Sequence, residues 1–173
     1  MDVCLREITA EDQEQLLQMK REIEALDGNF EGFTRLRAVD DFLVFMEKLE
    51  RSKHRELLLP GFSPETTYAA VNQVGHVVGA IVIRTELTEK LRCHGGNIGY
   101  LVRPRERNKG FGTAMLKAAV DKCRGTAMRR VLVTCRKENI ASVKVIERNQ
   151  GVYENDYITP EDGVCYQRYW IAL

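Results

Sequence analysis

Residues 101–116, LVRPRERNKGFGTAML, place an apolar strand, a basic glycine turn and a helical pattern in immediate succession. Pro104 ends the apolar run, because proline donates no ladder hydrogen bond and holds its predecessor extended. The first backbone N–H groups of a helix have no intrahelical partner, and together with the helix dipole they attract anions. The segment therefore predicts a phosphate-binding turn; the alternative is a tight turn with solvated arginines.

The side chains of this turn favour the anion interpretation. Gly110 and Gly112 carry no Cβ, so a pyrophosphate can approach the main chain closely. Three side chains add positive charge: Arg105, Arg107 and Lys109. Two common phosphate motifs are excluded, since no Gly-Lys-Ser/Thr follows as in a P-loop, and Met115 stands where the dinucleotide fingerprint has its third glycine.

Hydrophobic periods along the chain predict the element order β-α-α-β-β-β-α-β-α-β-β. Strands are expected at residues 3–8, 66–73, 75–87, 97–104, 129–135, 152–158 and 164–173. Helices are expected after the cap residue Thr9, and at 40–53, 110–124 and 138–151. Strands joined by crossover helices are typical of an α/β fold, here α+β with a mixed sheet.

Further stretches carry a resemblance to a known family. The turn, with Val102-Arg103-Pro104 before it, resembles the acyl-CoA-binding signature of the GNAT acetyltransferases, and residues 139–151 resemble that family's second pattern. A group of bacterial GNAT proteins shares a similar IGY-RP-ER-KG stretch (98–110) and a similar RYW strand (168–170). The resemblance is specific over residues 77–171. It implies one GNAT N-acetyltransferase domain over 1–173, with a variable acceptor side in 1–65 and an acetyl-CoA-binding core in 66–173.

The resemblance further implies direct transfer of the acetyl group of acetyl-CoA to an amine, with no metal. In this family the fourth strand supplies a backbone N–H for the developing oxyanion, and that N–H maps to Leu101 or Val102. The same strand can pair with the pantetheine arm. The expected donor-binding residues are Val102, Arg107, Asn108, Lys109, Gly110, Phe111, Gly112, Thr113, Asn139 and Ser142, with the pyrophosphate on the N–H groups of 107–113.

The residues for proton transfer depart from the family pattern. An ammonium acceptor must lose a proton before it attacks, since an amine pKa of about 10 leaves little neutral form at pH 7. Many GNAT enzymes place a Glu on the fourth strand, where this chain has Asn97, so His94 and Glu86 are the candidate bases and a water chain is an alternative. The Tyr that often protonates the leaving thiolate aligns with Ile146, so Tyr153 and Tyr157, which are nearby in the sequence, are the candidate acids. The thiolate of a thiol with a pKa of about 8.5–10 is also an adequate leaving group without a general acid.

Composition excludes several classes. A net charge of +1, from 26 basic and 25 acidic residues, gives no nucleic-acid footprint. The longest strongly apolar run, residues 77–83, is too short for a membrane span, and the N-terminus does not resemble a signal peptide. Five cysteines without a CxxC pair suggest reduced thiols. A cytoplasmic protein is expected.

Three functions stay open on the sequence alone. The first is an acetyltransferase acting on a small-molecule or peptide amine whose identity the sequence does not give. The second is an acyl-CoA-binding sensor or interaction module without turnover, because Asn97 and Ile146 replace the usual acid–base residues. The third is a plain phosphate binder. Since dimers are common in the family, a homodimer is a further expectation.

Overall fold

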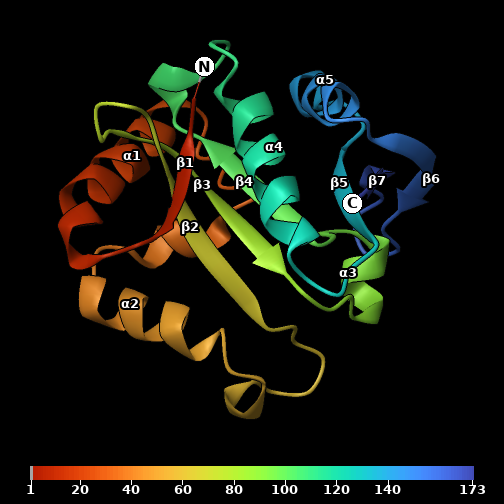
Figure 1. Ribbon diagram of the computed structural model, residues 1–173, viewed down its shortest axis with the longest axis horizontal. Coiled ribbons are helices and arrows are strands. Elements are labelled where there is room, and N and C mark those ends of the chain that lie inside the picture. Colours follow the sequence, from red (N-terminus) through yellow and green to blue (C-terminus); the bar gives the residue numbers. More distant parts are fainter. Residues whose placement is uncertain (1) are drawn as a thin grey trace.

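The strands of the computed structural model, which describes residues 2–173, form two antiparallel sheets (Figure 1). The first sheet has the order β1-β2-β3-β4, with strands Cys4–Glu7, Glu65–Val71, Val77–Arg84 and Ile98–Val102. The second has the order β5-β7-β6, with strands Arg130–Arg136, Cys165–Ala172 and Val152–Ile158. Each predicted strand is found, with bounds shifted by one or a few residues, so the predicted order is confirmed.

Four main helices connect or flank these strands: α1 (Gln13–Leu26), α2 (Phe42–Arg51), α4 (Phe111–Arg124) and α5 (Ile140–Arg148). Their starts follow ordinary capping chemistry. Asn139 caps α5, where its side-chain oxygen accepts from the N–H of Ser142 at 3.0 Å. The Asp12 carboxylate accepts from the Thr9 N–H at 2.9 Å where the α1 segment begins. One short helix, α3 (Glu89–Cys93), was not predicted.

The core lies on both faces of the first sheet. Helices α1 and α2 cover one face and α4 covers the other (Figure 1). Along β3, Ile81 and Ile83 pack toward α4, while Ala80 and Val82 pack toward α1 and α2. A strand that is buried on both faces has a continuous run of apolar residues in its sequence. This double coverage explains the run at residues 77–83.

The two sheets are joined just before β4, mainly by Asn97, beside which the Gly95 N–H donates to Thr134 of β5 at 2.8 Å. The Asn97 N–H donates to the carbonyl of Leu132 in β5 at 2.7 Å, and its side-chain oxygen accepts from the N–H of Leu132 at 2.8 Å. Its side-chain N–H donates to the carbonyl of Arg84 at 3.0 Å. Among residues 2–173 no ladder pairs β4 with β5, so the sheets separate beyond this junction.

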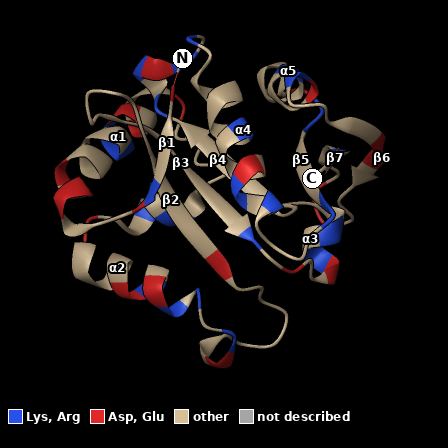
Figure 2. Ribbon diagram, viewed as in Figure 1, with Lys and Arg blue, Asp and Glu red and all other residues tan. Residues whose placement is uncertain are grey.

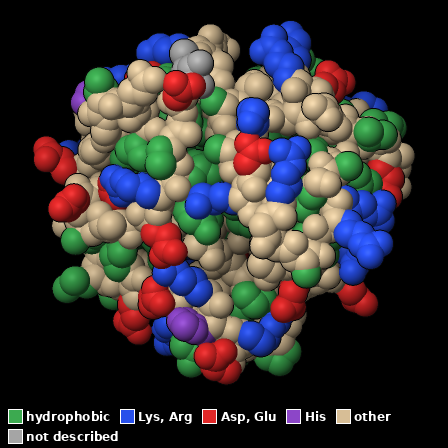
Figure 3. Space-filling model, viewed as in Figure 1, with side chains coloured by type: hydrophobic (Ala, Val, Ile, Leu, Met, Phe, Trp, Pro, Cys, Tyr) green, Lys and Arg blue, Asp and Glu red, His purple; other side chains and the backbone are tan. Residues whose placement is uncertain are grey.

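Acidic and basic residues alternate over the ribbon and over the surface (Figures 2 and 3), as the net charge of +1 suggests. Within the described part of the chain, every helix is too short or too polar to cross a lipid bilayer.

Candidate active site

A cleft of about 800 Å³ opens where the two sheets separate. One wall comes from β4, through Ile98, Gly99 and Tyr100, and the opposite wall comes from β5 and α5, through Thr134, Cys135, Arg136, Asn139 and Ser142. The rest of the lining comes from residues 31–35, from the segment before and at the start of β2 (Leu58, residues 60–63 and Glu65), from the end of β3 and the loop after it (Val82, Arg84, Thr88, Lys90, Leu91, His94 and Gly95), and from Tyr166. Residues far apart in the chain thus share one cavity.

The glycine turn between β4 and α4 has the geometry of an anion site. Asn108 and Gly110 have left-handed backbones, with φ of 61° and 84°. No hydrogen bond from the backbone N–H groups of residues 108–113 to another described residue is found. Backbone N–H groups that converge in such a turn form a concave nest for anions. The Arg107 N–H is occupied by the carbonyl of Pro104 at 3.2 Å, so the available run begins at Asn108, one residue later than expected.

The cations of this turn are held by acids. Three ion pairs join Arg105 to Glu22 at 3.4 Å, Arg107 to Asp27 at 3.3 Å and Lys109 to Glu106 at 3.1 Å. The Asn29 N–H, and after it the Arg107 guanidinium, keep the pKa of Asp27 below its usual range. Asp27 and Glu106 therefore offset the charges of Arg107 and Lys109, whereas Glu22 is shared between Arg103 and Arg105. The positive partial charge available to an anion at this turn comes from the backbone N–H groups of residues 108–113.

Gly112 has a packing role. A Cβ on Gly112 would lie 3.2 Å from Val145 of α5 and 3.4 Å from Val102 of β4. The neighbouring Phe111 side chain is buried in the core, and the Thr113 carbonyl accepts from Asn149 at 3.2 Å. In this structure Gly112 lets α4 pack closely against α5 and β4, a different reason for glycine than access for a pyrophosphate.

Tyr100 and Ser142 meet across the separation between the sheets. Their hydroxyl oxygens are 2.7 Å apart. Burial raises the pKa of Tyr100 well above its usual value and raises that of the nearby Cys135 to about 11. Both groups are therefore neutral at pH 7. Tyr100 and Tyr166 line the cleft, whereas the Tyr169 side chain belongs to the core.

A segment of the N-terminal third is fixed against β4. Gly32 has a φ of 89°, and a Cβ there would overlap the carbonyl oxygen of Tyr100. Only glycine allows this approach. The contact puts residues 31–35 beside the middle of β4 and so makes them part of the cleft.

Comparison with known proteins identifies the family. The family model described as "Acetyltransferase (GNAT) family" matches residues 27–152, which is most of the chain. The chain belongs to this family. The GNAT fold, the enzyme class of N-acetyltransferase and acetyl-CoA as co-substrate, all predicted above, are thereby confirmed. A search of curated protein sequences finds no match.

Solved GNAT structures share the fold at low sequence identity. RimL, a ribosomal-protein α-N-acetyltransferase in complex with coenzyme A, is 17% identical with a TM-score of 0.74, over 100% of this chain and 95% of its own. The microcin C7 self-immunity acetyltransferase MccE, in complex with acetyl-CoA and AMP, is 14% identical with a TM-score of 0.71, over 99% and 93%. A spermidine N-acetyltransferase chimera from Vibrio cholerae and hSSAT is 15% identical with a TM-score of 0.67, over 99% and 96%.

Of the four acid–base candidates in this GNAT chain (His94, Glu86, Tyr153 and Tyr157), only His94 lines the cleft. Its ring stacks on Tyr166 with centroids 5.1 Å apart, and burial, followed by the charge of Lys90, lowers its pKa. Glu86 is exposed, is paired with Arg55 and does not line the cleft. Tyr153 is half exposed on β6, where its hydroxyl donates to Asp156 at 2.9 Å. The structure therefore does not bring Glu86 or Tyr153 to the cleft.

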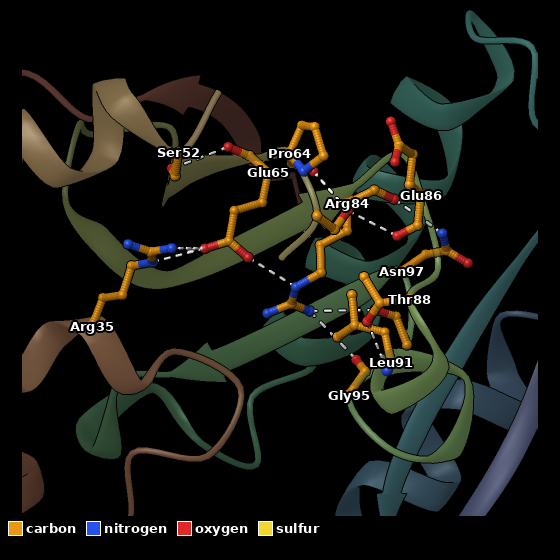
Figure 4. Close-up of polar contacts among 12 residues, drawn as sticks. Arg35, Ser52, Pro64, Glu65, Arg84, Glu86, Thr88, Leu91, Gly95 and Asn97 are labelled. Atoms are coloured by element: carbon orange, nitrogen blue, oxygen red, sulfur yellow. Dashed lines mark hydrogen bonds and ion pairs between the residues drawn. The ribbon is translucent and has the colours of Figure 1, made fainter. Parts of the chain in front are cut away.

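The cleft also contains a charged cluster that sequence reasoning missed. Glu65 at the start of β2 is buried, and it contacts Arg35 and Arg84 (Figure 4). The same juxtaposition is visible in Figure 2 as an acidic end of β2 beside a basic end of β3. An acidic residue at the edge of an apolar strand is the only local signal, and it does not identify its partners. Within the described residues, no group of three or more His, Cys, Asp and Glu side chains is placed to hold a metal ion.

Proposed function

We propose that acetyl-CoA binds in the cleft between β4 and β5, with its pyrophosphate on the N–H groups of residues 108–113. The observation that carries this proposal is the run of unpartnered N–H groups with left-handed Asn108 and Gly110. The turn itself does not line the cleft, but Gly112 lies next to Tyr100, which does. Such a nest favours a pyrophosphate. The pantetheine arm then runs along β4 past Val102, opposite Asn139 and Ser142, and the thioester lies near Tyr100.

We assign the proton transfer from the acceptor to His94. Its lowered pKa keeps the imidazole neutral at pH 7, so it can accept the proton of the bound ammonium, directly or through one water. The amine nitrogen then attacks the thioester carbon, and the backbone N–H of Val102 stabilises the oxyanion. The Leu101 N–H is less suited, because the register that pairs Arg103 with Val78 directs it toward β3. The C–N bond forms and the C–S bond breaks, which releases the CoA thiolate.

The thiolate takes its proton from solvent in this scheme. A phenol with a pKa raised well above 10, such as Tyr100, is a poor proton donor to a thiolate of conjugate pKa about 8.5–10. Tyr153, on the outer strand β6, makes its hydrogen bond away from the cleft. A dedicated acid is not required by the chemistry.

The acceptor is proposed to enter on the side formed by residues 1–65, because residues 31–35, residues 60–63 and Glu65 line the cleft there. A small-molecule or peptide amine fits this volume. The cytoplasmic location and the homodimer expected from the sequence stay predictions.

Calorimetric titration with acetyl-CoA, CoA and ADP tests the donor site. We expect acetyl-CoA and CoA to bind more tightly than ADP, because ADP lacks the arm that follows β4. Gly110→Ala should weaken acetyl-CoA, and Gly75→Ala is the matched control: Gly75 also has a left-handed φ, of 81°, but lies in the β2–β3 hairpin outside the cleft. If the two variants bound acetyl-CoA equally well, the pyrophosphate would not bind at residues 108–113. A module without turnover would bind acetyl-CoA but release no CoA with any amine.

A further inference from the structure

One carboxylate is shared by two guanidinium groups at the acceptor side of the cleft (Figure 4). Arg35 approaches one oxygen of Glu65 with Nε at 2.7 Å and Nη2 at 2.6 Å. Arg84 donates from Nε to the other oxygen at 2.8 Å. A single acid therefore balances two permanent cations, and one positive charge stays uncompensated within this cluster.

The three side chains are buried to different degrees. The Glu65 side chain is 9% exposed, that of Arg84 is 18% exposed and that of Arg35 is 34% exposed. Arg84 also reaches the carbonyls of Gly95 and Gly96 with Nη1 at 3.4 Å. No bond from Nη1 of Arg35 or Nη2 of Arg84 to another described residue is found. The acid lies deepest, and the arginines keep donors available.

The remaining charges of the cleft do not supply the missing negative charge. Its described lining contains four cationic side chains (Arg35, Arg84, Lys90 and Arg136) and two anionic ones (Glu31 and Glu65). Glu31 is already engaged by Arg136. A partly buried cation is stabilised by an anion that it can hydrogen-bond, and guanidinium groups match carboxylates and phosphates in geometry.

We propose that the amine acceptor carries an acid group, a carboxylate or a phosphate, which binds to Arg35 and Arg84 while its amine reaches the thioester. This inference rests on the proposed function, because it names the substrate class of the same site. The acid group is not altered in the reaction; it orients the acceptor and selects it.

The strand register indicates the span of such an acceptor. The Arg84 N–H donates to the carbonyl of Asn97, and Tyr100 lies three residues further along β4. Three strand residues correspond to about 10 Å. An acceptor whose amine and acid group are separated by a short chain fits this distance better than an α-amino acid.

The same charges disfavour polyamines. A polyamine would bring several positive charges into a cleft whose lining already has excess positive charge, and like charges repel most where water is scarce. Although the fold is shared with a spermidine acetyltransferase, the lining of this cleft favours acceptors of opposite charge.

Rates of CoA release with matched acceptors test the proposal. The panel contains ω-amino acids of increasing chain length, their carboxamides, phosphoethanolamine and spermidine. We expect each acid to exceed its own carboxamide by about tenfold to a hundredfold in kcat/KM, as loss of a hydrogen bond to a charged group predicts. Phosphoethanolamine against an amino acid of similar length shows whether a phosphate or a carboxylate is preferred.

Arg35→Gln identifies the group that makes the selection. It removes one cation while the Glu65–Arg84 pair remains, so the acid-to-amide ratio should fall toward one, and Arg35→Lys should retain part of it. The control Arg51→Gln removes a positive charge from the exposed side of α2, outside the cleft, and should leave the ratio unchanged. Acetyl-CoA affinity, measured in each variant, reports whether the donor site is intact.

The outcomes separate the inference from the function on which it rests. Equal rates for acids and amides, a preference for spermidine, or an unchanged ratio in Arg35→Gln would overturn the inference while acetyl transfer stands. If no amine releases CoA, calorimetric titration of the ω-amino acids onto the CoA-bound protein decides. Binding abolished by Arg35→Gln would keep the acid site without the proposed function, and absence of binding would overturn both.

Discussion

Asn97 connects three strands through its side chain, and its removal should open the junction between the sheets. In Asn97→Ala, the carbonyl of Arg84 and the N–H of Leu132 both lose their hydrogen-bond partner. Asn97 is 3% exposed, so water does not readily replace the amide. Each buried polar group left unpaired costs about 1–3 kcal/mol. We expect a loss of about 3 kcal/mol in the free energy of unfolding, or a Tm lower by about 6–12 °C for a domain of this size.

Urea unfolding followed by circular dichroism measures this loss, and Asn155→Ala is its matched control. Asn155 is an exposed asparagine on β6 whose side chain makes one bond, accepting from Arg168 at 2.9 Å. Its replacement should change stability by no more than about 0.5 kcal/mol. Acetyl-CoA affinity should fall in Asn97→Ala alone, since the junction sets how β4 and β5 separate.

A different pattern would refute this reasoning. If Asn97→Ala lost less than about 1 kcal/mol, its two side-chain bonds would not hold the sheets together. If it kept its stability and its acetyl-CoA affinity but lost turnover, Asn97 would act on the reacting groups.

Three further outcomes follow from the site. Gly112→Ala would place a Cβ 3.2 Å from Val145, so it should lower both Tm and acetyl-CoA affinity; reduced affinity at unchanged Tm, by calorimetry and thermal denaturation, would instead indicate that Gly112 is needed for direct access of the pyrophosphate. Because the His94 pKa is lowered, kcat at saturating substrates should stay constant near pH 7 and fall only at a pH below the ordinary histidine value of 6.5; His94→Gln should abolish this acid limb, and an unchanged profile would exclude His94 as the base. Burial raises the Cys135 pKa to about 11, so iodoacetamide at pH 7.5 should alkylate the exposed Cys4 long before Cys135, as mass spectrometry can measure; fast labelling of Cys135 would contradict its burial.

The features that the sequence predicted well depend on local physics. Periodicity located the strands and the main helices, a cap residue located α5 at Asn139, and the turn at 108–113 followed from a strand, a proline and glycines in one short segment. The short helix α3 was missed because five residues are too few to show a helical period.

The features that the sequence did not predict depend on which strands become neighbours. Alternation placed Tyr153 on a strand, but β6 is the outer strand of the second sheet, so its hydroxyl lies outside the cleft. Asn97 was recognised as a replacement for an acid, yet its bonds to Leu132 and Arg84 need the register of three strands. Glu65, Arg35 and Arg84 come from separate segments. The pairing of β2 with β3 places Glu65 beside Arg84, and the close contact of Gly32 with β4 brings the segment of Arg35 to them.

The turn before α4 and the acceptor side of the cleft offer a ligand different hydrogen-bond donors. At the turn, Asp27 and Glu106 each pair with one cation and Glu22 is shared by Arg103 and Arg105, while the backbone N–H groups of residues 108–113 are left for the pyrophosphate. At the acceptor end, two guanidiniums share Glu65, so side-chain charge is left for the ligand. Backbone N–H groups, whose positions are fixed, suit acetyl-CoA, because the same acetyl donor binds in every turnover. Long cationic side chains suit an acceptor that must be selected by its charge, and this division locates specificity at Arg35 and Arg84 instead of at the glycine turn.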